Sequence, residues 1–197
     1  MKKELDRWVF YHFASHPACL ALVALLFMAT PARAPASPTS LGTIAPDFLL
    51  RSGGGSELRL SDLKGAVALI FHETQESKNA NLALKRHLEA TGLAANEGNS
   101  PAFRIVAVAD CEPYPRLFRS IVELALVAVS RESNTTIYGD WRGDMARDYG
   151  VLRGDSNIFL LSPEGRIVWR FAGVLPEAGI AGLIALIRDL TGKGAAR

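Results

Sequence analysis

The sequence has 197 residues, of which 49% are hydrophobic and 21% are charged, with 22 basic and 20 acidic side chains. These proportions are typical of a folded protein and exclude an intrinsically disordered chain. The length suits one domain with a substantial core and is short for two.

Residues 1–36 have the three parts of a secretory signal. A basic start is followed by an uncharged apolar run from Ala18 to Thr30, and then by small residues and prolines. Ala34 and Ala36 fit the small-residue positions of a cleavage site, which predicts a mature chain beginning at Ser37. The alternative is an uncleaved membrane anchor. We favour cleavage because the apolar run is well short of the ~20 residues that cross a bilayer.

Cleavage would change both the charge and the cysteine count. Residues 1–36 hold four basic and two acidic residues, and removing these from totals of 22 and 20 leaves 18 of each. A neutral chain argues against a nucleic-acid partner, because non-specific binding requires basic groups that neutralise phosphates. We expect membrane contact only through the signal segment, if it is uncleaved. The same cut removes Cys19, which leaves Cys111 without an intramolecular disulfide partner.

After a leader at residues 37–44, we expect one domain over residues 45–191 and a short tail at 192–197. The domain begins with a predicted strand from Ala45 to Leu50, a glycine turn at 53–55 and a returning strand at 57–60, which together form a hairpin. A capped helical turn follows at Ser61-Asp62-Leu63 and ends at Gly65.

The middle of the domain alternates between strands and helices. Continuous apolar runs at 66–71 and 104–110 predict two buried strands. Helical spacing predicts a helix from Glu76 to Thr91 and a longer one from Pro115 to Arg131. The apolar positions of the longer helix share one face: Leu117, Phe118, Ile121, Leu124, Ala125 and Ala128.

The last third contains a short strand at 135–138, a short helix at 143–149, a hairpin and a final helix. The hairpin strands are 157–162 and 166–171, joined by a proline-led turn, and the final helix starts at Pro176. Alternating strands and helices predict right-handed crossovers and a sheet that is covered on both faces.

This order of elements resembles the thioredoxin-like superfamily, in particular its peroxiredoxin and secreted thiol-oxidoreductase branches. The matching segments are spread over nearly all of the domain: Ala45-Pro46-Asp47-Phe48, Leu60-Ser61-Asp62-Leu63-Lys64-Gly65, the strand ending at Phe71, Tyr149-Gly150-Val151 and Phe159 to Ile167. The resemblance implies a three-layer α/β/α sandwich with a mixed central sheet and an N-terminal β-hairpin.

The resemblance also implies a catalytic dithiol after Phe71, where a helix N-terminus would stabilise a thiolate. In many members of the superfamily the cysteines lie five and eight residues after this phenylalanine, and here those positions are Glu76 and Asn79. A cis-proline of the superfamily corresponds to Ser156. The loss of both landmarks indicates that the redox chemistry has been abandoned. The segment from Glu76 to Leu82 is also similar to the cysteine-less periplasmic YtfJ group.

Cys111 is the remaining residue with redox potential. It follows the strand 104–110, so the expected sheet places it at the edge where open α/β sheets hold their sites. A lone thiol there could form a mixed disulfide, whereas the alternative is a small buried apolar residue. Because Asp110 and Glu112 flank it and should raise its pKa, we favour the structural role.

Two further interpretations concern the turn after Phe71. Glu76 and Asn79 are either polar residues at a helix start, which is the interpretation we favour, or part of a relic cleft with His72, Glu73 and Ser156 beside it. A metal site formed by His72 with Glu73 or Glu76 is disfavoured, because the zinc-protease motif it resembles must lie on one helical face. We expect neither a metal nor a cofactor.

The sequence therefore predicts an exported, periplasmic or secreted protein without catalytic activity, whose partner is an envelope protein or a small ligand. The alternative is a monothiol thiol-disulfide oxidoreductase or peroxidase that acts through Cys111.

Overall fold

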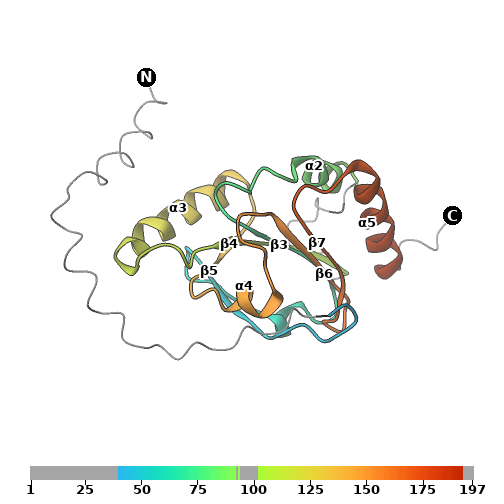
Figure 1. Ribbon diagram of the computed structural model, residues 1–197, viewed down its shortest axis with the longest axis horizontal. Helices are drawn as coiled ribbons and strands as arrows, with labels where there is room; N and C mark the ends of the chain where they lie inside the picture. The colour runs from blue at the N-terminus through green and yellow to red at the C-terminus, as the bar shows by residue number, and fades with distance from the viewer. Residues whose placement is uncertain (1–39, 92, 94–101, 193–197) are drawn as a thin grey trace, which may run out of the picture. The chain divides into compact units, whose positions relative to one another are not determined.

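The computed structural model describes residues 40–91, 93 and 102–192. The predicted signal segment, residues 37–39 of the predicted leader and all but the first residue of the predicted tail lie outside these residues. Within the described part, no helix is long and apolar enough to cross a membrane. At the centre lies a seven-stranded mixed sheet with the order β2-β1-β5-β4-β3-β6-β7 (Figure 1).

The elements follow the predicted order. The strands are β1 (Leu49–Ser52), β2 (Glu57–Arg59), β3 (Val67–Glu73), β4 (Phe103–Asp110), β5 (Ile137–Asp140), β6 (Asn157–Leu161) and β7 (Ile167–Ala172). The α-helices are α2 (Leu82–Ala90), α3 (Arg119–Glu132), α4 (Asp144–Tyr149) and α5 (Glu177–Leu190), and the 3-10 turns are η1 (Leu60–Leu63) and η2 (Arg116–Phe118).

Strand directions bring several chain segments to one edge of the sheet. β3, β4 and β5 are parallel, with Glu73 opposite Ala109 and Asp110 opposite Asp140. β6 runs antiparallel to β3 and begins beside its end. The N-terminal hairpin joins the sheet through β1, which pairs antiparallel with β5. The ends of three strands and the start of a fourth therefore meet at one place.

The sheet separates two hydrophobic cores because successive side chains of β3 point to opposite faces. Ala68 and Ile70 belong to the core under η1 and α4, whereas Leu69 and Phe71 belong to the core under α2 and α5. Helices α2, α3 and α5 cover one face and α4 covers the other (Figure 1). The expected three-layer sandwich with a mixed sheet is confirmed.

The sequence segments that resemble the superfamily meet in the core under α4. The ring of Tyr149 lies edge-on to Phe159, with 5.2 Å between their centroids, and 6.2 Å from the ring of Phe48. The Tyr149 hydroxyl donates a 2.9 Å hydrogen bond to the carbonyl oxygen of Pro46. This bond holds the chain before β1 against α4, and the first strand begins at Leu49 instead of at the predicted Ala45.

The predicted start of the helix after β3 was wrong by six residues. Residues 75–81 form turns, and α2 begins at Leu82. Thr74 and Ser77 exchange side-chain hydrogen bonds with each other's backbone N–H groups, which stabilises a turn in place of a helix. Asn81 directs its side chain across the sheet and helical geometry starts only after it.

Helix α3 differs from the expectation in the direction of its apolar face. Leu126 is its buried residue, whereas the predicted apolar face points to solvent. Leu117, Ile121 and Leu124 are 86%, 64% and 70% exposed. The helix therefore packs on the sheet through a narrow contact and leaves its most hydrophobic face uncovered in the described part of the chain.

Candidate functional site

The candidate site is the sheet edge where β3, β4 and β5 end and β6 begins. His72 and Glu73 are the last residues of β3, Cys111 follows β4, and Ser156 precedes β6. The structure thus brings these sequence-predicted residues to one edge, but places them on both faces of the sheet.

Glu73 lies on the face covered by α2, and both of its carboxylate oxygens are occupied. Lys85 of α2 donates to Oε2 at 2.7 Å, and the Ser156 hydroxyl donates to Oε1 at 2.7 Å. Lys85 Nζ also donates to the carbonyl oxygen of Lys78 at 2.8 Å and lies 5.1 Å from the centre of the Phe71 ring. The carboxylate and the ammonium neutralise each other at the end of β3.

Asn81 extends this network on the same face. Its Nδ2 donates to Ser156 Oγ at 2.9 Å and to the carbonyl oxygen of Gly173 at 2.8 Å, while its Oδ1 accepts from the Leu175 N–H at 2.8 Å. Asn81 and Ser156 are both fully buried. The amide therefore ties the start of α2 to the start of β6 and to the segment that leads into α5.

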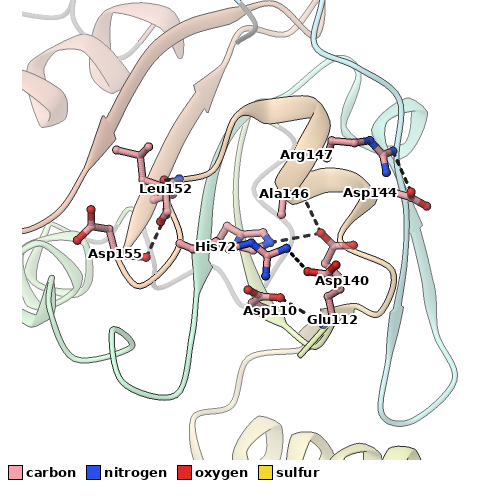
Figure 2. Close-up of polar contacts among 11 residues, drawn as sticks. His72, Asp110, Glu112, Asp140, Asp144, Ala146, Arg147, Leu152 and Asp155 are labelled. Carbon is pink, nitrogen blue, oxygen red and sulfur yellow. Dashed lines mark hydrogen bonds and ion pairs between the residues drawn. The ribbon is translucent and has the colours of Figure 1, made fainter. Parts of the chain in front are cut away.

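His72 lies on the opposite face, under α4. Its Nε2 is 3.4 Å from Asp140 Oδ2, and the same oxygen accepts the Ala146 N–H at 2.8 Å (Figure 2). Both side chains are buried. This pair joins the ends of β3 and β5 to the first turn of α4, and it is separated by the sheet from Glu73.

Cys111 is 1% exposed and lies against Gly139 of β5. A Cβ added at Gly139 would lie 3.1 Å from the Cys111 sulfur and 2.6 Å from the indole nitrogen of Trp141. The guanidinium of Arg119 lies over that indole ring, 4.7 Å from its centre. The absence of a side chain at Gly139 thus leaves room for both the indole and the sulfur against the backbone of β5.

Burial raises the pKa of the Cys111 thiol to about 12, and the charges of Asp110 and Asp140 contribute to the same direction. Asp110 and Glu112, its neighbours in the sequence, were the expected cause of the raised pKa. Desolvation is the larger cause, and Glu112 instead forms an ion pair with Arg153. At neutral pH the sulfur is a protonated thiol with little solvent access, which is a poor nucleophile.

Glu76 and Asn79 are exposed, in the turn that precedes α2. Because α2 begins at Leu82, neither residue lies in the first helical turn. They are therefore not the polar residues at a helix start that the sequence favoured. Glu76 lies close enough to Tyr114 for its charge to add to the burial that raises the pKa of that phenol.

Metal binding receives no support from the described residues, which contain no group of three or more potential ligands arranged to hold an ion. The proposed ligands His72 and Glu73 point to opposite faces of the sheet, and each already has a partner.

Comparison with solved structures finds the same architecture in thiol-disulfide oxidoreductases. A candidate protein disulfide isomerase of Bacteroides thetaiotaomicron has a TM-score of 0.62 and 19% identity over 79% of this chain and 92% of its own. A candidate thiol:disulfide interchange protein DsbE of Chlorobium tepidum has a TM-score of 0.57 and 24% identity over 78% and 99%. The chain has a thioredoxin-like fold.

A protein with alkyl peroxide reduction activity also has a structure similar to that of this chain. The bacterioferritin comigratory protein of Xanthomonas campestris has a TM-score of 0.53 and 17% identity over 73% of this chain and 92% of its own. No family model matches the sequence, and no curated protein matches it significantly. The thioredoxin-like fold is thus the level at which the comparisons agree with the resemblance in the sequence.

Three residues of this thioredoxin-like edge were not anticipated from the sequence: Asn81, Lys85 and Asp140. The helical spacing of residues 76–91 places Lys85 on the outer side of the predicted helix, whereas its ion pair with Glu73 depends on where α2 starts. Asp140 ends a short strand and faces a histidine 68 residues earlier in the chain. The burial of a polar amide at Asn81 had no local signal, because its partners are 75 to 94 residues away.

Proposed function

We propose that this protein is an exported, non-catalytic binding protein built on a thioredoxin-like fold. Glu76 and Asn79 stand where the superfamily resemblance implies a dithiol, and Ser156 stands where it implies a proline. Neither a carboxylate nor an amide can carry out thiol-disulfide exchange, which requires a thiolate nucleophile.

One observation carries the proposal: the polar side chains on the α2 side of the sheet edge form their hydrogen bonds and ion pairs within the protein. Glu73, Lys85, Asn81 and Ser156 satisfy one another and the neighbouring backbone. Within the described residues, no buried side-chain nitrogen or oxygen lacks a hydrogen-bond partner. Catalysis relies on preorganised groups that point toward a bound substrate, whereas these groups point toward other residues of the protein and bind them.

Cys111 is the basis of the alternative function, a monothiol oxidoreductase or peroxidase. Its position at the sheet edge suits that role, but its burial and its raised pKa both count against it. The non-catalytic role is therefore the one we propose.

Export is part of the proposal, and the features of residues 1–36 support it. An exposed lipoprotein thioredoxin of Streptococcus pneumoniae shares the fold, with a TM-score of 0.53 and 19% identity. We propose a partner in the cell envelope, either a protein or a small ligand.

The catalytic question is tested by assaying the purified protein for insulin reduction with a dithiol reductant and for peroxide reduction. A thioredoxin with its dithiol serves as the positive control. We expect rates equal to the uncatalysed background, and the same rates for Cys111→Ser. Turnover above background that disappears in Cys111→Ser would overturn the proposal in favour of the monothiol enzyme.

The binding role is tested in the intact cell envelope with a photo-crosslinking residue placed at Glu76, which is exposed at the sheet edge. Glu89 of α2 is also exposed and provides the matched control. We expect a crosslinked product from position 76 and none from position 89. Equal labelling from both positions, or none from either, would contradict a binding surface at this edge.

A further inference from the structure

The exposed face formed by η2 and α3 has the residue spacing of a coiled-coil seam. Leu117 of η2 and Ile121, Leu124 and Ala128 of α3 follow one another at intervals of four, three and four residues, and all four are exposed. This spacing alternates between the d and a positions of a heptad, with leucine at both d positions and isoleucine at one a position. Such a face normally packs against another helix.

Three residues of α3 outside the seam have contacts within the molecule. Leu126 is buried beneath the helix, and Arg119 pairs with Glu123 at 2.9 Å while its guanidinium covers Trp141. The charges in the first half of the helix are therefore neutralised by its own molecule. The four seam residues Leu117, Ile121, Leu124 and Ala128 are themselves uncharged.

We propose that this seam is a homodimer interface in which α3 packs antiparallel against α3 of a second copy. In an antiparallel coiled coil each a position faces a d position of the partner helix. Ile121 then meets Leu124 of the second copy, and Ala128 meets Leu117. Each large side chain at the ends lies opposite a small one, so the same face is complementary to itself, as a twofold interface requires.

Charge supports a second copy over other occupants. After removal of residues 1–36 the chain has equal numbers of basic and acidic residues, so two copies approach without net repulsion. A helix that lies on a membrane surface typically has a polar face rich in lysine and arginine. The charged residues of α3 are instead two arginines and two glutamates, of which Arg119 and Glu123 form an ion pair, and the helix contacts its own sheet through Leu126.

The size of the seam sets the strength of the interaction. The apolar residues from Leu117 to Ala128 span about 16 Å along the helix at 1.5 Å per residue. Patches of this kind cover roughly 300–600 Å², below the ~800 Å² per partner of a standard interface. We therefore expect a weak dimer that forms reversibly as the protein concentration rises.

The test is sedimentation of the purified protein over a range of concentrations, with and without residues 1–36. We expect monomer at low concentration and dimer at high concentration in both forms. Leu124→Arg should weaken association at least about tenfold, with an unchanged melting temperature because the side chain is exposed. Val174→Arg is the matched control, since Val174 is 68% exposed outside the seam, and it should dimerise normally.

The antiparallel register has its own test. Ile121→Glu and Leu124→Arg should each be monomeric alone, but a mixture should form a heterodimer because residue 121 faces residue 124 of the other copy. A mixture that stays monomeric would overturn the register. The proposal fails if the wild-type protein is monomeric throughout, if Leu124→Arg dimerises normally, or if dimerisation depends on the presence or absence of residues 1–36. Binding to vesicles that Leu124→Arg abolishes would equally overturn it, in favour of a membrane occupant.

Discussion

At the scale of single residues, burial has more influence than sequence neighbours on the chemistry of the sheet edge. Cys111 is flanked in sequence by two acids, yet desolvation is the larger cause of its raised pKa. Glu73 has one acidic and one amide residue within three positions, yet a lysine twelve residues later neutralises it. These partners arise from the fold and could not be read from local sequence.

The state of Cys111 predicts its reactivity. A thiol-alkylating reagent should label the native protein at pH 8 much more slowly than the urea-unfolded protein. The reason is that the folded thiol is buried and has a pKa of about 12, so it stays protonated at pH 8. The unfolded thiol loses its proton near the ordinary cysteine pKa of 9.0. This thiol's contribution to stability should therefore decline as pH rises from about 9 toward 12. Comparable labelling rates for folded and unfolded protein would contradict the burial of the sulfur.

Asn81 predicts a large loss of stability from a small change. Asn81→Ala removes three hydrogen bonds and leaves the buried Leu175 N–H without a partner. We expect a loss of roughly 2–4 kcal/mol in the free energy of unfolding, measured by urea denaturation. The control is Asn79→Ala, an exposed asparagine two residues earlier, which should change it by less than about 0.5 kcal/mol. Similar values for the two variants would show that the network contributes little.

At the scale of elements, the sequence predicted the existence and order of nearly every helix and strand. Hydrophobic periodicity identified α3, but periodicity reports where the apolar residues lie and not which side is covered. The predicted apolar face of α3 is the exposed one, because the helix contacts the sheet mainly through Leu126. The early start predicted for α2 failed for a related reason, since the turn at Thr74 and Ser77 depends on side-chain bonds.

The contact between the β1–β2 turn and α3 gives a prediction for two neighbouring glycines. A Cβ at Gly53 would lie 2.2 Å from the Glu123 carbonyl oxygen, whereas one at Gly54 would have 3.9 Å of space. Gly53→Ala should therefore lower the free energy of unfolding by about 1–3 kcal/mol, and Gly54→Ala should have little effect. Chemical denaturation of both variants provides the measurement, and equal stabilities would argue against close packing of the turn on α3.

At the scale of the whole molecule, the fold could be predicted because the sequence segments that resemble the superfamily pack together in one core. Phe48, Tyr149 and Phe159 come from three distant segments, and each segment was recognisable in the sequence. The site was less predictable. The positions at the sheet edge followed from the order of strands, but the division between its two faces required the register of β3 with its neighbours.

The stability of the whole protein should be insensitive to reductant. A native disulfide typically contributes about 2–4 kcal/mol, and Cys111 is buried with no cysteine partner among the described residues. The melting temperature of the protein lacking residues 1–36 should be the same with and without dithiothreitol, as measured by circular dichroism. A clear decrease on reduction would reveal a covalent crosslink between copies.

The alternation of side chains along β3 has a consequence for how this protein tolerates change. His72 and Glu73 are consecutive, yet one is anchored to α4 and the other to α2, on either side of a solid sheet. Damage to one anchor should leave the other intact. The losses in free energy of unfolding caused by His72→Ala and Glu73→Ala should then add in the double variant, to within about 0.5 kcal/mol. Substitutions on one face of the sheet should therefore be tolerated independently of the residues on the other face.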